Sequence, residues 1–316
     1  MKILFTCIGR RVELVQAFRA AAERLSVDLQ ILATDASQTA PAATFCDKTF
    51  IAPKISSDEY LPFLLNLCKS EGVDGLIPTI DTDLLPLAKT KARFEAVGTT
   101  VFVANPDKVL LCRDKRLTSD YFNSLGLYAP KTISNVDEYV DAFPAFIKPK
   151  DGSSSLNAFK ADDMQQLRAY ADKITDYVIQ PFIEGTEYTV DVFCDKTGAP
   201  VHVTPRIRLA VRAGEVLKTE IRQDKGIVDE ILKLVQDFRP SGAITVQLIK
   251  HNVTGKNAYI EINPRFGGGA PLSIKAGADE AEALIRVLAG EKLPFYEGAA
   301  EDGAVYSRFD QSVRVR

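Results

Sequence analysis

An acid, an amide and a guanidinium follow one another at alternate positions near the end of a short apolar strand. They are Glu261, Asn263 and Arg265 in the segment AYIEINPR, residues 258–265. Because side chains of a strand point alternately to its two faces, we expect Tyr259 on the same face as the acid and the amide, and the two isoleucines on the other. Such a polar face could bind a metal ion, and the cation beyond it could neutralise a phosphoryl group.

A glutamine interrupts the apolar strand that is predicted to pair with this one. Gln247 lies inside AITVQLIK, residues 243–250, and the linker NVTGKN that follows suits a hairpin. Pairing would bring Gln247 near Glu261 across the ladder. Glutamine, glutamate and asparagine supply only oxygens and one negative charge, which suits Mg²⁺ when phosphate oxygens complete its shell. We therefore expect Gln247, Glu261 and Asn263 to bind metal; the alternative is a polar hairpin that faces solvent.

Three glycines follow this strand and lead into a predicted helix. Gly267, Gly268 and Gly269 would let the backbone approach a ligand closely, and the N-terminus of a helix favours anions. We expect Gly267 and Gly268 to contact the substrate. The alternative is an ordinary glycine-rich turn between a strand and a helix.

Lysine and serine residues in the middle of the chain could bind phosphates. Lys148 ends the apolar strand AFIK, where a buried lysine without an acidic neighbour in sequence would be costly. The loop DGSSS that follows offers backbone N–H groups and the hydroxyls of Ser153, Ser154 and Ser155; a plain surface turn is the alternative. The lysine precedes the glycine, so this is not a Walker loop, and TCIGRR near the N-terminus lacks the glycines of a dinucleotide-binding oxidoreductase.

A broken strand in QPFIEGTEYTVDV, residues 180–192, could bind a nucleobase. Pro181 would leave backbone groups of Phe182 and Ile183 unpaired, and such groups beside an apolar surface can read the edge of an adenine. Glu187 begins the next strand and could accept hydrogen bonds from two ribose hydroxyls. The alternative is a simple β-bend with a solvated glutamate.

Two secondary-structure patterns divide the chain and must position these groups. Up to about residue 105, short apolar strands alternate with helical segments, which predicts βαβ units and a parallel sheet. Later segments predict antiparallel strands around an amphipathic helix, KGIVDEILKLVQDF. Ligands of parallel sheets bind at the carboxyl ends of the strands, which here carry Gly9-Arg10-Arg11, Asp35 and Asp81-Thr82-Asp83.

Composition excludes several classes of protein. Lys and Arg total 39 against 42 Asp and Glu, a formal charge of −3, so nucleic acid is not an expected partner. No apolar run could cross a bilayer, and the N-terminus has no signal-peptide core, so we expect no membrane association and a cytoplasmic location. Five scattered cysteines and two histidines argue against disulfides, zinc sites and Ser-His or Cys-His catalysis.

Taken in order, these motifs resemble those of the ATP-grasp family. The matching segments are Asp114-Lys115, Lys148 to Ser155, QPFIEGTEYTVDV, Gln247 and EINPR. The trio of glutamine, glutamate and asparagine followed by NPR is most similar to one half-module of the carbamoyl phosphate synthetase large subunit. The N-terminal region resembles the preATP-grasp domain, so the resemblance covers nearly the whole chain.

The resemblance implies two domains of different fold class, the first α/β and the second α+β. A Rossmann-like parallel sheet, the preATP-grasp domain at residues 1–105, would precede an ATP-grasp domain of antiparallel sheets at residues 106–316. A phosphate-lid subdomain would occupy about residues 120–182.

The same resemblance assigns roles to single residues. The residues implied to bind ATP are Lys115, Lys148, Ser153, Ser154, Ser155, Gln180, Phe182, Ile183 and Glu187. The lysines would contact its phosphates under the serine loop, and Gln180 and Ile183 would hold the adenine. Gln247, Glu261 and Asn263 would bind two Mg²⁺ ions, replaceable by Mn²⁺, with Glu261 bridging. Arg265 would act in catalysis by meeting the γ-phosphoryl group and the acyl oxygen.

Further charged residues are candidates for substrate binding. Arg206 and Arg208 share one face of the strand in RIRLAVR, with Arg212 in phase, and could hold carboxylates; a strand edge charged against aggregation is the alternative. Asp81, at a strand end of the first domain, could receive an amine or could instead cap the following helix.

We therefore expect an ADP-forming ligase that activates a carboxylate as an acyl phosphate and joins it to an amine, both small molecules. One alternative is a carbamoyl-phosphate-synthetase-like enzyme that phosphorylates bicarbonate or carbamate within a split assembly with a glutaminase subunit, since the chain holds one half-module and no glutaminase. Another is a nucleotide-binding regulatory module without turnover. The chain could also form a homodimer.

Overall fold

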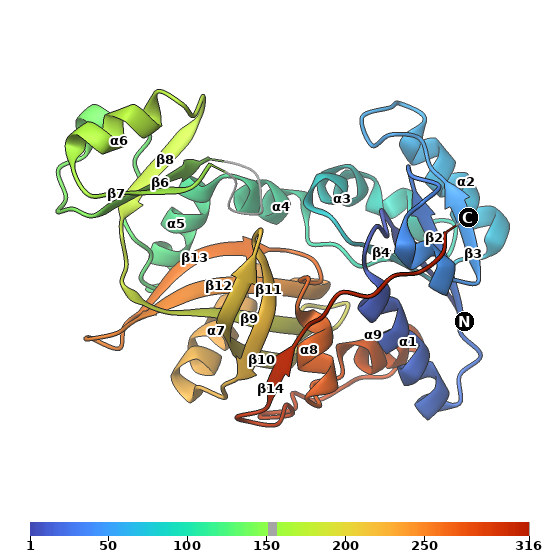
Figure 1. Ribbon diagram of the computed structural model, residues 1–316. Helices are drawn as coiled ribbons and strands as arrows, with labels where there is room; N and C mark the ends of the chain where they lie inside the picture. Colours follow the sequence, from blue (N-terminus) through green and yellow to red (C-terminus); the bar gives the residue numbers. More distant parts are fainter. Residues whose placement is uncertain (151–156, 316) are drawn as a thin grey trace.

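The computed structural model describes residues 1–150 and 157–315, and it begins with a five-stranded parallel sheet in the order β3-β2-β1-β4-β5 (Figure 1). The strands are β1 (Lys2–Thr6), β2 (Gln30–Asp35), β3 (Lys48–Ile51), β4 (Gly75–Pro78) and β5 (Thr100–Val101). Helices α1 (Val12–Leu25), α2 (Tyr60–Glu71) and α3 (Asp81–Glu95) and the 3-10 helix η1 (Pro41–Phe45) connect them. The predicted parallel sheet is confirmed.

A six-stranded antiparallel sheet forms the centre of the rest of the chain, in the order β13-β12-β9-β10-β11-β14. Its strands are β9 (Gly185–Cys194), β10 (Pro200–Arg212), β11 (Glu215–Ile221), β12 (Gly242–His251), β13 (Asn257–Asn263) and β14 (Val305–Ser307). Helix α7 (Lys225–Phe238) buries an apolar stripe at helical spacing against this sheet. Helices α8 (Ala270–Lys275) and α9 (Glu280–Leu288) lie beside α1 and join the sheet to the N-terminal region (Figure 1).

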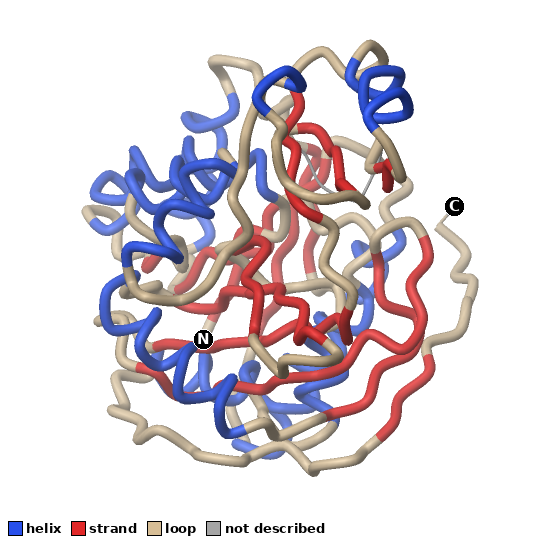
Figure 2. Tube along the Cα trace, turned by 90° about the vertical axis from the view of Figure 1, so that its left-hand side faces the viewer, coloured by secondary structure: helices blue, strands red, loops and turns tan. Residues whose placement is uncertain are grey.

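A third, smaller sheet has the order β7-β6-β8 and a core of its own. It consists of β6 (Ala145–Pro149), β7 (Phe159–Ala161) and β8 (Tyr177–Pro181), with α6 (Met164–Ala171) packed on it and η2 (Val136–Glu138) nearby. Helices α4 (Pro106–Arg113) and α5 (Lys115–Ser124) lead into it. Figure 2, seen from the side, places this small sheet above the central one. The divisions at residues 105, 120 and 182 stay predictions.

Strands β12 and β13 form the predicted hairpin, but the strict alternation expected of β13 is wrong. Gln247 pairs with Glu261 as expected, whereas the next residue, Leu248, pairs with Tyr259, so Ile260 is an extra residue that forms a β-bulge. Tyr259 therefore joins Ile262 in the core beneath the sheet, and Ile260 turns to the same face as Glu261. The bulge places an apolar and an acidic side chain next to each other on one face.

A buried ion pair links two neighbouring strands of the central sheet. The Arg206 guanidinium donates to Asp191 with an Nε–Oδ2 distance of 2.7 Å, and the two side chains are only 2% and 1% exposed. Ser273 of α8 donates to the same carboxylate oxygen at 2.7 Å. Burial raises the pKa of nearby Glu280 well above its usual range, with the Asp191 charge as a smaller cause. Asp191 is thus the anion that offsets the charge of Arg206 inside the protein.

Replacing Asp191 should therefore destabilise the protein strongly. Asp191→Ala leaves the Arg206 charge buried without its partner, which typically costs about 3–5 kcal/mol. Urea unfolding followed by circular dichroism measures the change. The matched control is Asp310→Ala, because Asp310 pairs with Arg212 on the exposed surface and should shift the midpoint little. Equal midpoints for the two variants would contradict the assigned importance of the buried pair.

Candidate functional site

Two adjoining pockets open on the face of the central sheet where β12 and β13 pair. The larger has a volume of about 610 Å³ and the smaller about 300 Å³. They share Gln247 and Glu261 from the hairpin, and Arg208 and Gly214 from the β10–β11 region. The paired residues Gln247 and Glu261 thus mark the junction of the two pockets. We call them the large pocket and the small pocket.

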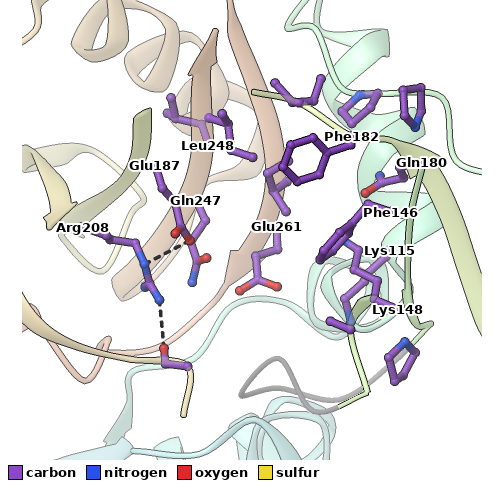
Figure 3. A pocket seen from close by; sticks show the side chains of 18 of the residues that line it. Lys115, Phe146, Lys148, Gln180, Phe182, Glu187, Arg208, Gln247, Leu248 and Glu261 are labelled. Atoms are coloured by element: carbon purple, nitrogen blue, oxygen red, sulfur yellow. Dashed lines mark hydrogen bonds and ion pairs between the residues drawn. The ribbon is translucent and has the colours of Figure 1, made fainter. Parts of the chain in front are cut away.

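The large pocket lies between the small sheet and the central sheet. From the small sheet and the segments around it come Lys115, Phe146, Lys148, Gln180, Phe182 and Ile183. From the central sheet come Glu187, Gln247, Leu248, Ile260 and Glu261. Figure 3 shows Leu248 and Phe182 in the upper part of the view, the two lysines on the lower right, and the Glu261 carboxylate across from the lysines. One end of the pocket is therefore apolar, and the other carries charge.

Two of the three side chains predicted to bind a nucleobase and ribose have partners of their own. Gln180 is buried and donates its amide to Thr132 Oγ1 at 2.7 Å. Phe182 is 37% exposed, which leaves part of its ring open at the pocket. Its backbone N–H donates to the oxygen of Pro144 at 2.9 Å, so the expectation that this group is unpaired is wrong. Glu187 forms an ion pair of 3.0 Å with the guanidinium of Arg208. These residues meet in one pocket, and their predicted roles stay predictions; Ser153, Ser154 and Ser155 lie outside the described residues.

Lys148 is a buried cation at the charged end of the large pocket. Its side chain is 7% exposed, and its ammonium lies 5.8 Å from the centre of the Phe146 ring. Burial lowers the pKa of Lys148 to about 8; Glu261 opposes this shift, and Lys115 adds to it. Lys115 itself donates to the backbone oxygen of Lys150 at 3.3 Å. The two lysines thus concentrate positive charge opposite Glu261.

Glu261 and Asn263 point to the same side of β13, next to Gln247 of β12. The Asn263 amide donates to Glu261 Oε1 at 3.0 Å. Glu261 is half-buried and forms no ion pair with any described residue. In the described parts of the chain, no group of three or more His, Cys, Asp or Glu could hold a metal ion. A metal at this junction would therefore need the amide oxygens of Gln247 and Asn263 and oxygens of a ligand.

The small pocket is lined by residues from distant parts of the chain. Arg265 donates to Asp81 Oδ2 at 2.7 Å and to the backbone oxygen of Phe266 at 3.1 Å. Asp81 is the first residue of α3, but Ile80 precedes it as the cap, so the predicted alternative of Asp81 as the helix cap is wrong. Asp81 acts instead as the counter-ion of Arg265.

Arg11 also enters the small pocket; the sequence placed it at a strand end where ligands bind but gave it no role. Its guanidinium donates to the backbone oxygen of Thr79 at 2.9 Å. Burial lowers the pKa of Arg11 to about 10, and repulsion by Arg265 adds to that, while Glu215 and Asp81 oppose it. Its position after the first parallel strand was the available signal. Glu215, Thr245, Phe146, Leu248 and Ile260 were also missed.

The predicted row of arginines along β10 is only partly present. Arg206 and Arg208 both line the small pocket, but Arg206 is bound to Asp191, and Arg208 bridges Glu187 and the backbone oxygen of Gly214. Arg212 pairs with Asp310 on the surface, because the register of β10 shifts on either side of Ala210. The expectation that Arg212 is in phase with the other two is therefore wrong.

The glycines of the predicted loop line the small pocket, as expected from their position. A Cβ on Gly269 would lie 2.5 Å from Arg206 Nη2, and one on Gly267 would lie 2.7 Å from Thr245 Oγ1. Gly268 has more room, since its Cβ would lie 3.4 Å from Arg11 Nη1. The first and third glycines are thus required by packing, and Gly268 faces the arginine.

Comparisons with known proteins agree with this architecture. The model of the ATP-grasp domain matches residues 112–269, half of the chain, and that of the PylC-like N-terminal domain matches residues 3–102. A carbamoyl-phosphate synthase of Methanobrevibacter smithii is 25% identical over 173 residues, 52% of this chain and 46% of that protein. The chain thus spans less than half the length of this relative.

Two further similarities cover most of the chain. A 3-methyl-D-ornithine–L-lysine ligase of Methanosarcina acetivorans is 23% identical over 292 residues, 91% of this chain and 75% of that protein. The biotin carboxylase domain of 2-oxoglutarate carboxylase from Hydrogenobacter thermophilus superposes with a TM-score of 0.74 at 16% identity, over 96% of this chain and 73% of that one. This likeness concerns the fold.

Because Lys148 is buried, replacing it should stabilise the protein by an amount that depends on pH. The pKa of Lys148 is about 8 in the folded protein and 10.5 in the unfolded chain, so between these pH values the unfolded chain binds the proton more tightly. The free energy of unfolding of the native sequence therefore rises with pH in this window. Lys148→Met lacks this rise. The variant should be the more stable protein by up to about 3 kcal/mol below pH 8, and the difference should shrink towards pH 10.

Urea unfolding at pH 7 and pH 9.5 measures this difference. Lys292→Met is the control, because Lys292 is exposed and its removal should give no pH-dependent change. A Lys148→Met variant whose stability difference is the same at both pH values would refute the lowered pKa.

Proposed function

The chain belongs to the ATP-grasp family, and from that premise we propose that it is an ATP- and Mg²⁺-dependent, ADP-forming ligase. It activates a carboxylate as an acyl phosphate and joins the acyl group to an amine. The observation that carries the proposal is the oxygen cluster of Gln247, Glu261 and Asn263 at the junction of the large and small pockets. Groups in the two pockets can react only across this junction.

The large pocket fits ATP with its adenine at the apolar end. Phe182, Leu248 and Ile260 provide an apolar surface for a flat ring, and Ile183 lines the same end of the pocket, where its backbone could meet the edge of the ring. The triphosphate would lie along Lys115 and Lys148. Glu187 would accept from the ribose, and for this it would share its carboxylate with Arg208. The related biotin carboxylase domain was solved as a complex with MgADP, ADP and bicarbonate.

The chemistry of the oxygen cluster fits Mg²⁺. Glu261 is a half-buried carboxylate without an ion pair among the described residues, flanked by two amides whose oxygens are neutral donors. Mg²⁺ prefers such hard oxygens together with phosphate oxygens. When bound, the metal would neutralise charge on the transferred phosphoryl group. Gln247, Glu261 and Asn263 would hold the two ions that the family resemblance implies.

The small pocket fits the carboxylate substrate. Arg11 and Arg265 bring two guanidinium groups close enough to repel each other, and Asp81 and Glu215 offset their charge only in part. An added carboxylate would relieve this repulsion and could accept hydrogen bonds from either group. Gly268 faces Arg11 without a side chain in between, which leaves space for the substrate. Arg206, Arg208 and Gly267 complete this wall.

The reaction follows from these positions. An oxygen of the carboxylate attacks the γ-phosphorus of ATP, a new O–P bond forms, and the bond from the γ-phosphorus to the bridging oxygen breaks to release ADP. The amine nitrogen then attacks the acyl carbon, and inorganic phosphate leaves as the amine gives up a proton. Arg265 supplies positive charge where both leaving groups develop negative charge, and Lys148 holds the phosphates in place.

A second candidate uses bicarbonate as the carboxylate. The similarity to a carbamoyl-phosphate synthase and the small volume of the pocket next to Glu261 favour it. In that case a glutaminase subunit would supply ammonia. The homodimer and the cytoplasmic location also stay proposals. None of the described helices is long and apolar enough to cross a membrane.

Glu261 provides the sharpest test of the proposed function. Glu261→Gln keeps the size and the oxygen but removes the charge, so ADP release with a carboxylate and hydroxylamine should fall by about 100-fold or more. Glu184→Gln, an exposed control in the same region, should keep full activity. Hydroxylamine traps acyl phosphates as coloured hydroxamates, so a panel of carboxylates identifies the donor. If the Glu261→Gln variant turns over at the normal rate, the assignment of Glu261 as a metal ligand is wrong.

The same assay separates the two candidate functions. We expect organic carboxylates to give hydroxamate and to stimulate ADP release, and bicarbonate alone to stimulate it little. The bicarbonate candidate predicts the reverse, with ADP release that depends on bicarbonate and yields no hydroxamate. If the protein releases no ADP with any organic carboxylate or with bicarbonate, both proposals are wrong.

A further inference from the structure

A third groove, outside the two pockets, lies at the carboxyl edge of the parallel sheet. It has a volume of about 620 Å³ and is lined by residues at or after the ends of β1, β2 and β3, among them Cys7, Asp35 and Ile55, with Tyr60 of α2 and Arg113 of α4. It extends from the segments after β2 and β3, past the end of β1, to Ile80 and Thr82 after β4, and so includes the point between β1 and β4 where the strand order changes direction. Open parallel sheets bind ligands at such crossover points. We call it the N-terminal groove.

The floor of the N-terminal groove is held by a buried hydrogen-bond network. Tyr60 donates its hydroxyl to Asp83 at 2.8 Å, and Thr6 donates to the other oxygen of the same carboxylate. Thr79 donates to the backbone oxygen of Cys7 at 2.7 Å, and Cys7 is held in the left-handed region with a φ of 52°. Non-glycine residues adopt this conformation mainly where the surrounding structure imposes it. The groove is therefore preformed.

Charges of both signs border the apolar surface of this groove. Both oxygens of Asp35 accept from backbone N–H groups, those of Gly9 and Ser37, each at 2.8 Å, which fixes the carboxylate at the end of β2. Elsewhere on its rim stand Lys54 and Arg113, and neither side chain forms an ion pair or hydrogen bond with a described residue. The groove thus complements a molecule that carries a positive or N–H donating group and a carboxylate.

The N-terminal groove adjoins the small pocket. Ile80 and Thr82 line both, and Asp81 between them pairs with Arg265 on the small-pocket side. The end of α4 also lies close to both regions: burial raises the pKa of the Cys112 thiol, and the charges of Asp81 and Glu261 add to the shift. Only the turn at the start of α3 separates the groove from the residues proposed to activate the carboxylate.

We propose that the N-terminal groove binds the amine substrate, and that this substrate is an amine that also carries a carboxylate, as an amino acid does. The inference rests on the proposed function. The body of the substrate lies on the apolar surface, its carboxylate meets Arg113 and Lys54, and its amine passes Ile80 and Thr82 to the acyl phosphate in the small pocket. Asp81 lies where the amine arrives and can accept a hydrogen bond from it.

Three variants test the groove without changing the residues proposed to act on ATP or the carboxylate. Arg113→Glu and Lys54→Glu reverse the charges at its rim, and Ala36→Trp fills the space beside Asp35, since Ala36 is exposed and lines the groove. Lys196→Glu is the control, because Lys196 is also an exposed cation and lies in the turn between β9 and β10, outside the groove. Circular dichroism checks that each variant is folded.

Two assays on each variant separate amine binding from carboxylate activation. Hydroxamate formation at saturating hydroxylamine reports activation, because hydroxylamine is small and should not need the groove. Amine binding is measured as ADP release at increasing concentrations of alanine, leucine or lysine. Each amino acid is compared with the matched amine that lacks the carboxylate: ethylamine, 3-methylbutylamine and 1,5-diaminopentane. The donor is the carboxylate that gives most hydroxamate with the native sequence.

We expect the best amino acid to saturate at a concentration at least tenfold lower than its matched amine. Arg113→Glu and Ala36→Trp should raise the KM for that amino acid at least tenfold and leave hydroxamate formation within about twofold, while Lys196→Glu changes neither. Unchanged KM values in all three groove variants would overturn the proposal, as would hydroxamate formation that falls in parallel. Absence of hydroxamate from the native protein would instead mean that the proposed function itself has failed.

Discussion

The pairing of β12 with β13 is the constraint on which the site depends. Gln247 faces Glu261 across the ladder, and the bulge at Ile260 turns two successive side chains to the same face. The apolar surface proposed to bind a nucleobase and the carboxylate proposed to bind a metal thereby lie on adjacent residues. A regular strand would have sent Ile260 into the core and Tyr259 into the pocket, and the junction between the two pockets would have lost its apolar neighbour.

The site contains charges that the protein buries at a cost in stability. Lys148 is buried and holds its proton weakly, and Arg206 is buried with Asp191 as its counter-ion. Such groups rarely stabilise a fold compared with apolar residues, so their presence here points to ligands. Arg265 and Asp81 add an ion pair between residues 184 positions apart. It ties the end of the hairpin to the parallel sheet, and the small pocket exists only while both are in place.

Local features of the site could be predicted from the sequence, and long-range features could not. The hairpin, the meeting of Gln247 with Glu261, and the parallel sheet follow from short patterns and a short linker. The bulge does not, because Tyr259 and Ile260 both suit a core or a pocket. The sequence placed Arg11 and Asp81 at strand ends and named Asp81 as a substrate candidate, but the ion pair of Asp81 with Arg265 could not be predicted, because only the folded chain brings the two regions together. The ion pair of Arg206 could have been predicted, because Asp191 is an acidic residue inside the neighbouring apolar strand.

The central claim is that an oxygen of the substrate carboxylate attacks ATP, and oxygen-18 labelling tests it most directly. A donor carboxylate labelled with oxygen-18 is turned over with unlabelled ATP and an amine, and the released phosphate is analysed by mass spectrometry. The account predicts that each amide formed is accompanied by one ADP and by one phosphate that has gained one labelled oxygen. Phosphate without label, or release of AMP and pyrophosphate in place of ADP, would contradict it.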